Sequence, residues 1–331
     1  MREPAFWWRP TGLLSSLLAP LGAAYGTIAE RRMTGRGALA GIPVICVGNF
    51  TLGGAGKTPT ALMLVAMLRE MGASPFCLTR GYGGSVQGPH LVDPHTDSGA
   101  EVGDEALLLA RATPTVVSRD RVQGAAFAKA KGATVILMDD GLQNASLAKS
   151  LTVAVVDSRR GVGNGQVFPA GPLRAPLHIQ MTRCDALLVV GDGQNEAARD
   201  VVARAGARPV FHGHLEPDET AVTALHARKV LAFAGIGDPH KFFATVEQAG
   251  IAIVERRAFA DHHRFTAEEA AELTMVAERE GLSLLTTEKD HVRMAGDPAL
   301  AALADKAHVL PVSMVIEQHE ALRDLVARTL R

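Results

Sequence analysis

Cysteine is scarce in this chain. Its three cysteines, Cys46, Cys77 and Cys184, are far apart in the sequence, and no two of them form a C-x-x-C pair. An odd number of scattered cysteines argues against a disulfide framework and against a zinc site built from paired thiolates. The pattern is typical of a protein that works in a reducing compartment.

A surplus of charge of either sign is also missing. The 34 basic and 35 acidic residues leave a formal net charge of −1. No overall basic field attracts nucleic acid, so we expect no nucleic-acid partner. Internal repeats and low-complexity tracts are absent from the sequence. What is present is a chain of 331 residues, 47% of them hydrophobic, which is enough for about two domains with sizeable cores.

The apolar stretch near the N-terminus, residues 13–25, is too short to span a membrane. A spanning helix needs ~20 apolar residues, and Pro20 interrupts this stretch. Trp7, Trp8 and Tyr25 flank it, and such side chains favour the lipid headgroup region. No clear signal-peptide cleavage site follows. We therefore predict a segment over 1–36 that attaches to a membrane surface, with a helix packed on the protein core as the alternative. Nearby arginines would be attracted to anionic lipid: Arg2, Arg9, Arg31, Arg32 and Arg36.

A glycine-rich turn joins an apolar run at 42–47 to a segment with helical character from residue 60. The turn ends in GGAGKT at 53–58, and strand, glycine turn and helix in this order are typical of a P-loop. Its backbone N–H groups and the helix N-terminus would bind phosphate. Lys57 would reach the β- and γ-phosphates, and the Thr58 hydroxyl would face Mg²⁺. Thr51 stands where the usual pattern has glycine, so an ordinary glycine turn is the alternative.

Acidic residues follow predicted strands and open a predicted helix. The apolar strand at 134–138 ends in Asp139 and Asp140, which resembles the Walker B element that holds Mg²⁺. Asp104 and Glu105 stand at the start of a predicted helix. Either they cap the helix and interact with its dipole, or they act as a base or a metal ligand. Ligands of a parallel sheet bind at the carboxyl ends of its strands, so these acids should lie near the P-loop.

The alternation of apolar strands and helical segments predicts an α/β protein. We expect a P-loop NTPase-like, mostly parallel sheet with helices on both faces over 37–225, and a smaller α/β domain over 226–331. One strand is predicted over 308–315, before a C-terminal helix. The sequence TRCD at 182–185 lacks the lysine of a guanine-specific motif and precedes a strand, so we expect ATP rather than GTP.

Six short motifs resemble those of one family. The chain is similar to the tetraacyldisaccharide 4′-kinases, the lipid A 4′-kinases of Gram-negative bacteria, over nearly its whole length. Asn144 stands where that family usually has histidine, so we assign it no acid–base role. The motifs are VGN at 47–49 with the P-loop, TRGYG at 79–83, VGDE at 102–105, DDGLQ at 139–143, PAGPLR at 169–174 and DHH at 261–263.

The resemblance implies a kinase that uses ATP and Mg²⁺ to phosphorylate the 4′-hydroxyl of a tetraacylated glucosamine disaccharide 1-phosphate, forming lipid IVA in lipid A biosynthesis. It implies a place at the cytosolic face of the inner membrane. Asp104 would be the base, paired with His262, and Lys57 would serve the transferred phosphate. The implied nucleotide-binding residues are Thr51, Gly53, Gly54, Ala55, Gly56, Lys57, Thr58 and Tyr82; the metal region comprises Thr58, Glu105, Asp139 and Asp140; and Asn49, Arg121, Gln143 and Arg174 would bind the acceptor substrate.

Two other functions share the P-loop. A membrane-associated P-loop ATPase or GTPase acting as a switch would hydrolyse nucleotide without a lipid acceptor and would usually need a dimer. A kinase of a soluble metabolite would have the N-terminal segment packed in its core. For the glycolipid kinase we expect a monomer that acts at the membrane surface.

Overall fold

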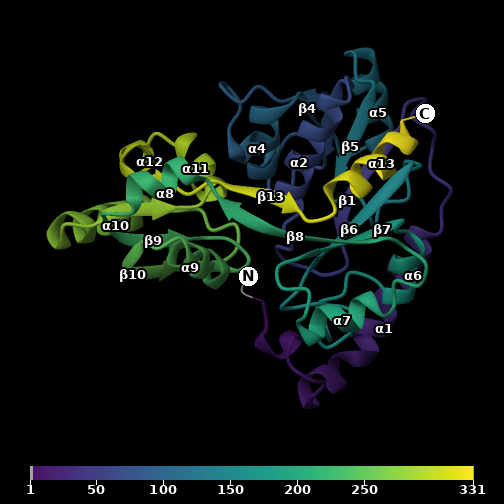
Figure 1. The fold of residues 1–331 in the computed structure, drawn as a ribbon, viewed down its shortest axis with the longest axis horizontal. Coiled ribbons are helices and arrows are strands. Elements are labelled where there is room, and N and C mark those ends of the chain that lie inside the picture. The colour runs from purple at the N-terminus through teal and green to yellow at the C-terminus, as the bar shows by residue number, and fades with distance from the viewer. Residues whose placement is uncertain (1–2, 331) are drawn as a thin grey trace.

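The computed structural model describes residues 3–330, which form two α/β lobes of unequal size. Figure 1 shows the larger lobe on the right, the smaller lobe on the left, and the N-terminal helix below the larger lobe. The fold prediction, a P-loop NTPase-like lobe with a second α/β lobe, is confirmed.

The larger lobe is built on a nine-stranded sheet in the order β13-β8-β7-β6-β1-β5-β2-β4-β3. The strands from β8 to β4 in that order run parallel, and the two edge strands, β13 and β3, are antiparallel to their neighbours. The central strands are buried along their whole length, as expected when helices cover both faces. The strands are β1 (Val44–Asn49), β2 (Pro75–Thr79), β3 (His90–Leu91), β4 (Thr115–Val117), β5 (Val135–Asp139), β6 (Leu151–Asp157), β7 (Ala186–Val190), β8 (Val210–Pro217) and β13 (Val312–Ile316).

Alternate side chains of the central strands enter two different cores. Ile45 and Val47 of β1 pack with α2, α4 and α13, whereas Val44 and Cys46 pack with α5 on the opposite face. The two-residue period of a strand thus produces the predicted three-layer arrangement. The helices of this lobe are α2 (Lys57–Glu70), α3 (Gly99–Val102), α4 (Asp104–Ala112), α5 (Arg121–Ala130), α6 (Leu177–Thr182), α7 (Glu196–Val202) and α13 (His319–Thr329).

The smaller lobe has a four-stranded, all-parallel sheet in the order β10-β9-β11-β12. Its core lies on both sides of this sheet, around Phe233 and Phe265 on one face and Phe243 and Val246 on the other. Its strands are β9 (Lys229–Ala234), β10 (Ala252–Ala258), β11 (Ser283–Thr286) and β12 (His308–Val309), and its helices are α8 (Glu219–Leu225), α9 (Pro239–Gln248), α10 (Ala267–Glu280), α11 (Glu288–Ala295) and α12 (Ala301–Lys306).

The single strand predicted over 308–315 is wrong, because the structure has two strands there. β12 belongs to the small sheet, and β13 pairs with β8 at the edge of the large sheet. Pro311 lies between them; it has no N–H to continue a ladder, and its carbonyl accepts a hydrogen bond from Asp218 instead. β13 and α13 therefore join the large lobe, whereas the predicted domain boundaries at residues 36 and 225 stay predictions.

The N-terminal segment forms a short 3-10 helix, η1 (Ala5–Trp8), and α1 (Leu13–Met33). α1 packs through its small residues: a Cβ added at Gly22 would lie 2.7 Å from the carbonyl oxygen of Val167, and one at Gly26 would lie 3.4 Å from Pro176. Its other face leaves large apolar side chains exposed. They are Leu13, Leu14, Leu17, Leu21, Tyr25 and Ile28.

The predicted role of the tryptophans is not supported. Trp7 is buried, and its indole N–H donates to the carbonyl oxygen of Pro169, while Trp8 donates to Glu3 and stacks under Arg160. Both indoles thus serve contacts within the protein. Within residues 3–330 no helix combines the length and apolar character needed to cross a membrane. Membrane attachment through the exposed face of α1 remains a prediction.

Candidate active site

The P-loop connects the end of β1 to the start of α2, as predicted. Gly53 and Gly56 have φ angles of 98° and 94°, a left-handed backbone that glycine adopts without strain. Asn49, fully buried, fixes the loop from inside: its amide donates to the carbonyl oxygen of Gly53 at 3.2 Å, and its Oδ1 accepts from Lys57 Nζ at 3.2 Å. The buried Lys57 and Thr58 are therefore held at the helix N-terminus, where phosphate binds.

Asp139 ends β5, the strand next to β1, and pairs in register with Val47. Its side chain is buried, and neither carboxyl oxygen has a hydrogen-bond partner among the described residues. Burial, reinforced by the neighbouring charges of Glu105 and Asp140, raises the pKa of Asp139 to about 7. An orphaned carboxyl at the carboxyl edge of the sheet, beside the P-loop, fits a bound cation.

Asp140 occupies a left-handed backbone conformation with φ 52° and is neutralised by cations. Arg174 Nη1 binds its two oxygens at 2.9 and 2.8 Å, and Lys57 Nζ lies 3.7 Å from Oδ1. Burial alone would raise the pKa of Asp140, but Lys57 and Arg174 hold it well below its usual range. The pKa values of the two adjacent acids are therefore shifted in opposite directions, raised for Asp139 and lowered for Asp140.

Residues 3–330 contain no group of three His, Cys, Asp or Glu side chains placed to hold a metal unaided. This fits Mg²⁺, which usually takes one or two protein ligands and completes its shell with phosphate and water. Of the predicted metal residues, Thr58, Asp139 and Asp140 lie around the P-loop, whereas the Glu105 carboxylate binds Lys289 Nζ at 2.6 Å. Lys289 lowers the pKa of Glu105 against the opposing effect of burial.

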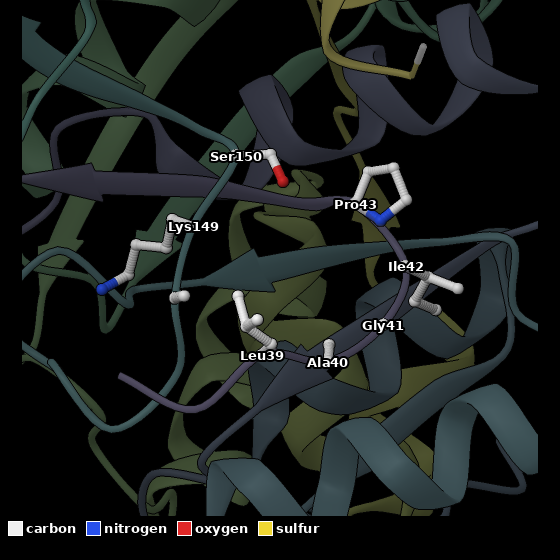
Figure 2. Close-up of a pocket in the computed structure, with 8 residues that line it drawn as sticks. Leu39, Ala40, Gly41, Ile42, Pro43, Lys149 and Ser150 are labelled. Atoms are coloured by element: carbon white, nitrogen blue, oxygen red, sulfur yellow. The ribbon is translucent and has the colours of Figure 1, made fainter. Parts of the chain in front are cut away.

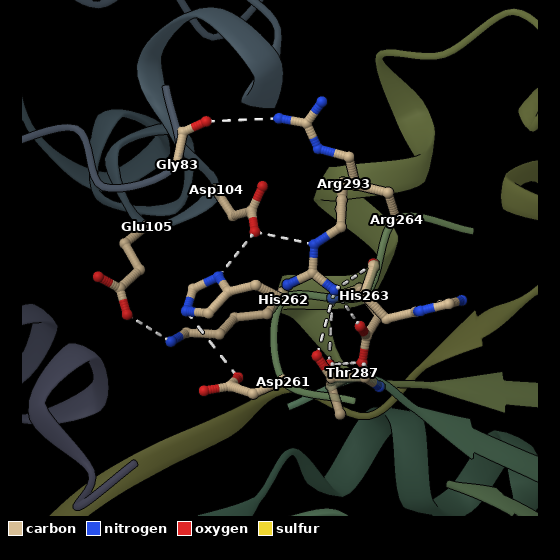
Figure 3. A network of polar contacts seen from close by, with 12 residues as sticks. Gly83, Asp104, Glu105, Asp261, His262, His263, Arg264, Thr287 and Arg293 are labelled. Carbon is tan, nitrogen blue, oxygen red and sulfur yellow. Dashed lines mark hydrogen bonds and ion pairs between the residues drawn. The ribbon is translucent and has the colours of Figure 1, made fainter. Parts of the chain in front are cut away.

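The contact between Asp104 and His262 brings the two lobes together (Figure 3). Asp104 is the first residue of α4 in the large lobe, and His262, with φ 55°, follows β10 in the small lobe. His262 Nδ1 lies 3.4 Å from Asp104 Oδ2, and Arg293 Nε donates to the same oxygen at 2.8 Å. Burial opposes ionisation of Asp104, but the His262 and Arg293 contacts outweigh it and lower the pKa of that carboxyl.

A second set of ion pairs joins the lobes on the β6 side of the P-loop. Lys241 Nζ binds Asp157 Oδ2, at the end of β6, at 2.8 Å, and Asp238 receives Arg159 at 2.8 Å and Arg160 at 3.1 Å. A Cβ added at Gly237 would lie 3.2 Å from the backbone nitrogen of Gly54, so the turn after β9 rests against the phosphate loop itself. Sequence reasoning missed this contact.

Of the four predicted acceptor residues, Asn49, Gln143 and Arg174 contact the P-loop or the end of β1, whereas Arg121 contacts the segment between β4 and α5. Gln143 donates to the carbonyl oxygen of Asn49 and to Gln180, which braces the end of β1. Arg174 Nε donates to the carbonyl oxygen of Thr51. Arg121 is buried and donates to Ser118, while its Nε has no partner among the described residues and burial lowers its pKa to about 10. The contacts of Gln143 and Arg174 thus support the geometry of the P-loop.

Tyr82, predicted near the adenine, lies with its ring 5.2 Å from the His262 ring and is 67% exposed. Tyr82 thus lies at the junction of the lobes, beside the contact between Asp104 and His262.

The surface hollow of about 380 Å³ in Figure 2 lies away from this site. Residues 39–43 and 148–150 line it, and these residues directly precede β1 and β6. It therefore lies at the amino ends of the strands, opposite the P-loop.

The fold and site define a class: a P-loop phosphotransferase with its nucleotide loop at the carboxyl edge of a parallel sheet. The family model described as tetraacyldisaccharide-1-P 4′-kinase (LpxK) matches residues 14–331. The chain belongs to the tetraacyldisaccharide 4′-kinase family, and the resemblance seen in the sequence is confirmed.

Relatives and a solved structure agree with this assignment. A tetraacyldisaccharide 4′-kinase of Rhodopseudomonas palustris strain BisB5 is 54% identical over 98% of this chain and 95% of its own length. One from Nitrobacter winogradskyi is 51% identical over 98% and 97%. The crystal structure of LpxK from Aquifex aeolicus in complex with ATP superposes with a TM-score of 0.76 at 28% identity, covering 96% of this chain and all of that one. These findings support the kinase and not the ATPase or GTPase switch.

Proposed function

We propose that this protein transfers the γ-phosphate of ATP to the 4′-hydroxyl of a tetraacylated glucosamine disaccharide 1-phosphate, forming lipid IVA. The observation that carries the proposal is the inter-lobe contact of Asp104 with His262 beside an intact P-loop, in a chain of this family. Transfer to an alcohol requires a base and a phosphate-binding loop, and here the base lies at the junction of the lobes while the loop lies on the large sheet.

Asp104 takes the proton of the sugar hydroxyl as its oxygen bonds to the γ-phosphorus, and the bond from that phosphorus to the ADP oxygen breaks. His262 Nδ1, 3.4 Å from Asp104 Oδ2, orients the carboxylate and shares its proton. Lys57 and the P-loop amides bind the phosphates, and Asn49 holds both in place. The buried carboxyl of Asp139, with Thr58, would hold Mg²⁺, which when bound neutralises charge on the β- and γ-phosphates.

Binding of the acceptor is proposed for cations near the P-loop. Arg174, once released by Asp140, and Arg121, once released by Ser118, would face phosphate groups. Asn49 and Gln143 would act indirectly, by fixing the shape of the P-loop. Tyr82, exposed beside His262, would lie close to the nucleotide.

The protein is proposed to act as a monomer at the cytosolic face of the inner membrane, attached peripherally. A four-chain lipid stays in the bilayer, since each buried CH₂ contributes ~0.8 kcal/mol toward remaining there. The exposed apolar face of α1 supports attachment at the same surface.

The proposal is tested by incubating the purified protein with radiolabelled ATP, once with the disaccharide lipid in detergent and once with water alone. Label in the lipid, dependent on Mg²⁺, is expected. Release of labelled phosphate without labelled lipid would instead identify an ATPase.

A further inference from the structure

Arg293, on α11 of the small lobe, lies at the centre of the contact between the lobes. Its side chain is 7% exposed, although arginine is rarely buried without partners. Its Nε donates to Asp104 Oδ2 at 2.8 Å, across the lobe boundary, and its Nη1 donates to Asp290 Oδ1 at 2.7 Å. Figure 3 shows the guanidinium between the Asp104 carboxylate and the turn that carries His262.

The same guanidinium also holds the backbone around His262. Nη1 donates to the carbonyl oxygens of His263 at 3.1 Å and Gly235 at 3.2 Å, and the His262 N–H itself bonds to the Gly235 carbonyl at 3.1 Å. One planar group thus contacts the carboxylate from one lobe and, from the other, the turn that positions the imidazole. A planar guanidinium with several fixed N–H donors holds the carboxylate and the turn in one relative position, which the flexible ammonium of a lysine does less well.

Asp290 keeps the arginine in place. It is fully buried, and its Oδ2 accepts from the Gly235 N–H at 3.0 Å and the Thr287 hydroxyl at 2.7 Å, while Oδ1 takes Arg293. The guanidinium therefore cannot turn away from Asp104 without depriving the buried Asp290 carboxylate of its cationic partner, which is costly.

We propose that Arg293 is a positioning residue for phosphoryl transfer, which fixes the Asp104 carboxylate and the His262 turn in their working arrangement. The inference rests on the proposed function, in which Asp104 is the base. Both Arg293 and His262 contact Oδ2, and no described residue donates a hydrogen bond to Oδ1, so the second oxygen is left for the acceptor hydroxyl.

The charges around Asp104 agree with this role. Facing it from the small lobe are His262 and Arg293, with Asp290 behind the arginine, and beside it on α4 lies Glu105, paired with Lys289. Arg293 and His262 lower the pKa of Asp104 against the effect of burial. The arginine thus favours the ionised form of the base while it holds the carboxylate in position.

The first test compares Arg293→Gln and Arg293→Lys with a matched control, Arg279→Gln, whose exposed arginine pairs with Glu280 on the outer surface. We expect Arg293→Gln to lower kcat by about 10- to 100-fold with the KM for ATP within about two-fold, because a small misplacement of the base affects the chemical step. Arg293→Lys, which keeps the charge beside Asp290, should fold and recover part of kcat. Arg279→Gln should match the wild type.

A double-variant cycle with Asp104→Asn separates positioning from a structural role. If Arg293 acts through Asp104, adding Arg293→Lys or Arg293→Gln to Asp104→Asn should lower kcat by no more than about two-fold further. In Arg293→Gln the acid limb of the kcat/KM profile should move to higher pH, since the cation that lowers the pKa of the base is gone.

Fully additive losses, or an unchanged kcat and pH profile, would overturn the positioning role. Failure of the wild type to label the lipid would overturn the proposed function instead, so the two failures are distinguishable.

Discussion

At the scale of single residues, the chemistry depends on which acids are charged. Asp104, Glu105 and Asp140 each have cationic partners, whereas Asp139 is buried without a partner among residues 3–330. The sequence predicted all four acids near the P-loop, because the carboxyl ends of parallel strands meet at one edge. It could not predict Arg293, Lys289 or Lys241. Their partners are 84 to 189 residues away along the chain, and no local pattern specifies such pairs.

Asp104→Ala should lower kcat by on the order of 10²-fold or more, because loss of the base affects the chemical step. The Kd of ATP, measured by calorimetry, should change little, since Asp104 contacts no P-loop residue. Asp200→Ala, which removes an exposed acid from α7, serves as the control and should retain activity. Wild-type turnover in Asp104→Ala would exclude the base role.

Asp139→Asn should stabilise the nucleotide-free protein at high pH while impairing Mg²⁺-dependent activity. The folded-state pKa of Asp139 is raised to about 7, above an unfolded value of ~3.9. The folded state therefore holds this proton longer, and the contribution of Asp139 to stability falls as pH rises from ~4 through about 7. Thermal denaturation of both proteins at pH 6 and pH 8 measures this effect. The stability of the Asn variant relative to the wild type should be greater at pH 8 than at pH 6, by on the order of 1–2 kcal/mol. Equal effects at the two pH values would contradict the prediction.

At the scale of elements, α1 has two faces of different chemistry. Gly22 and Gly26 lie against residues 167–176, while Leu17 and Leu21 are 76% and 61% exposed. The sequence predicted attachment to a membrane surface, with packing on the protein core as the alternative, and the structure shows a helix that is packed on one side only. Composition alone could not show which side chains of the segment are packed and which are exposed, because small and large residues are interspersed along the same helix.

Leu17→Asp combined with Leu21→Asp should reduce recovery of the protein with anionic vesicles while leaving its melting temperature within about 2 °C, since exposed apolar side chains contribute little to the fold. Sedimentation with vesicles and thermal denaturation measure the two effects. Unchanged vesicle binding would remove α1 as the attachment element.

Gly22→Leu, on the packed face of α1, should instead lower the stability of the protein. A Cβ at residue 22 lies 2.7 Å from the Val167 carbonyl oxygen, so the larger side chain must displace the helix from the lobe, at a cost of about 1–3 kcal/mol. The melting temperature should fall, and Ala23→Leu, on the exposed side, should not lower it. A stable Gly22→Leu protein would show that this packing is not needed for the fold.

At the scale of the whole molecule, two sets of ion pairs join the lobes on either side of the P-loop. Arg293–Asp104 and Lys289–Glu105 form one, and Lys241–Asp157 with the Asp238 pairs forms the other. The alternation of strands and helices predicted both lobes. The predicted last strand was wrong because a proline within an apolar run allowed the chain to change sheets, and Pro311 was a visible signal for that change.

Asp238→Asn should loosen the small lobe. Asp238 accepts the Lys241 N–H at the start of α9 and binds Arg159 and Arg160, and Gly237 beside it rests on Gly54. We expect faster amide exchange over 235–241 and a several-fold higher KM for ATP, because the turn no longer rests firmly on the loop. Asp192→Asn, in an exposed turn, is the control. Unchanged exchange and KM would show that this bridge has no such role.

The pairing of β8 with β13 also determines how the small lobe could be deleted from the chain. The chain leaves the large lobe through Pro217 and re-enters it at Val312, and these two residues are ladder partners. The small lobe is therefore inserted between neighbouring ends, so a short turn grafted between them would close the remaining polypeptide without spanning any gap.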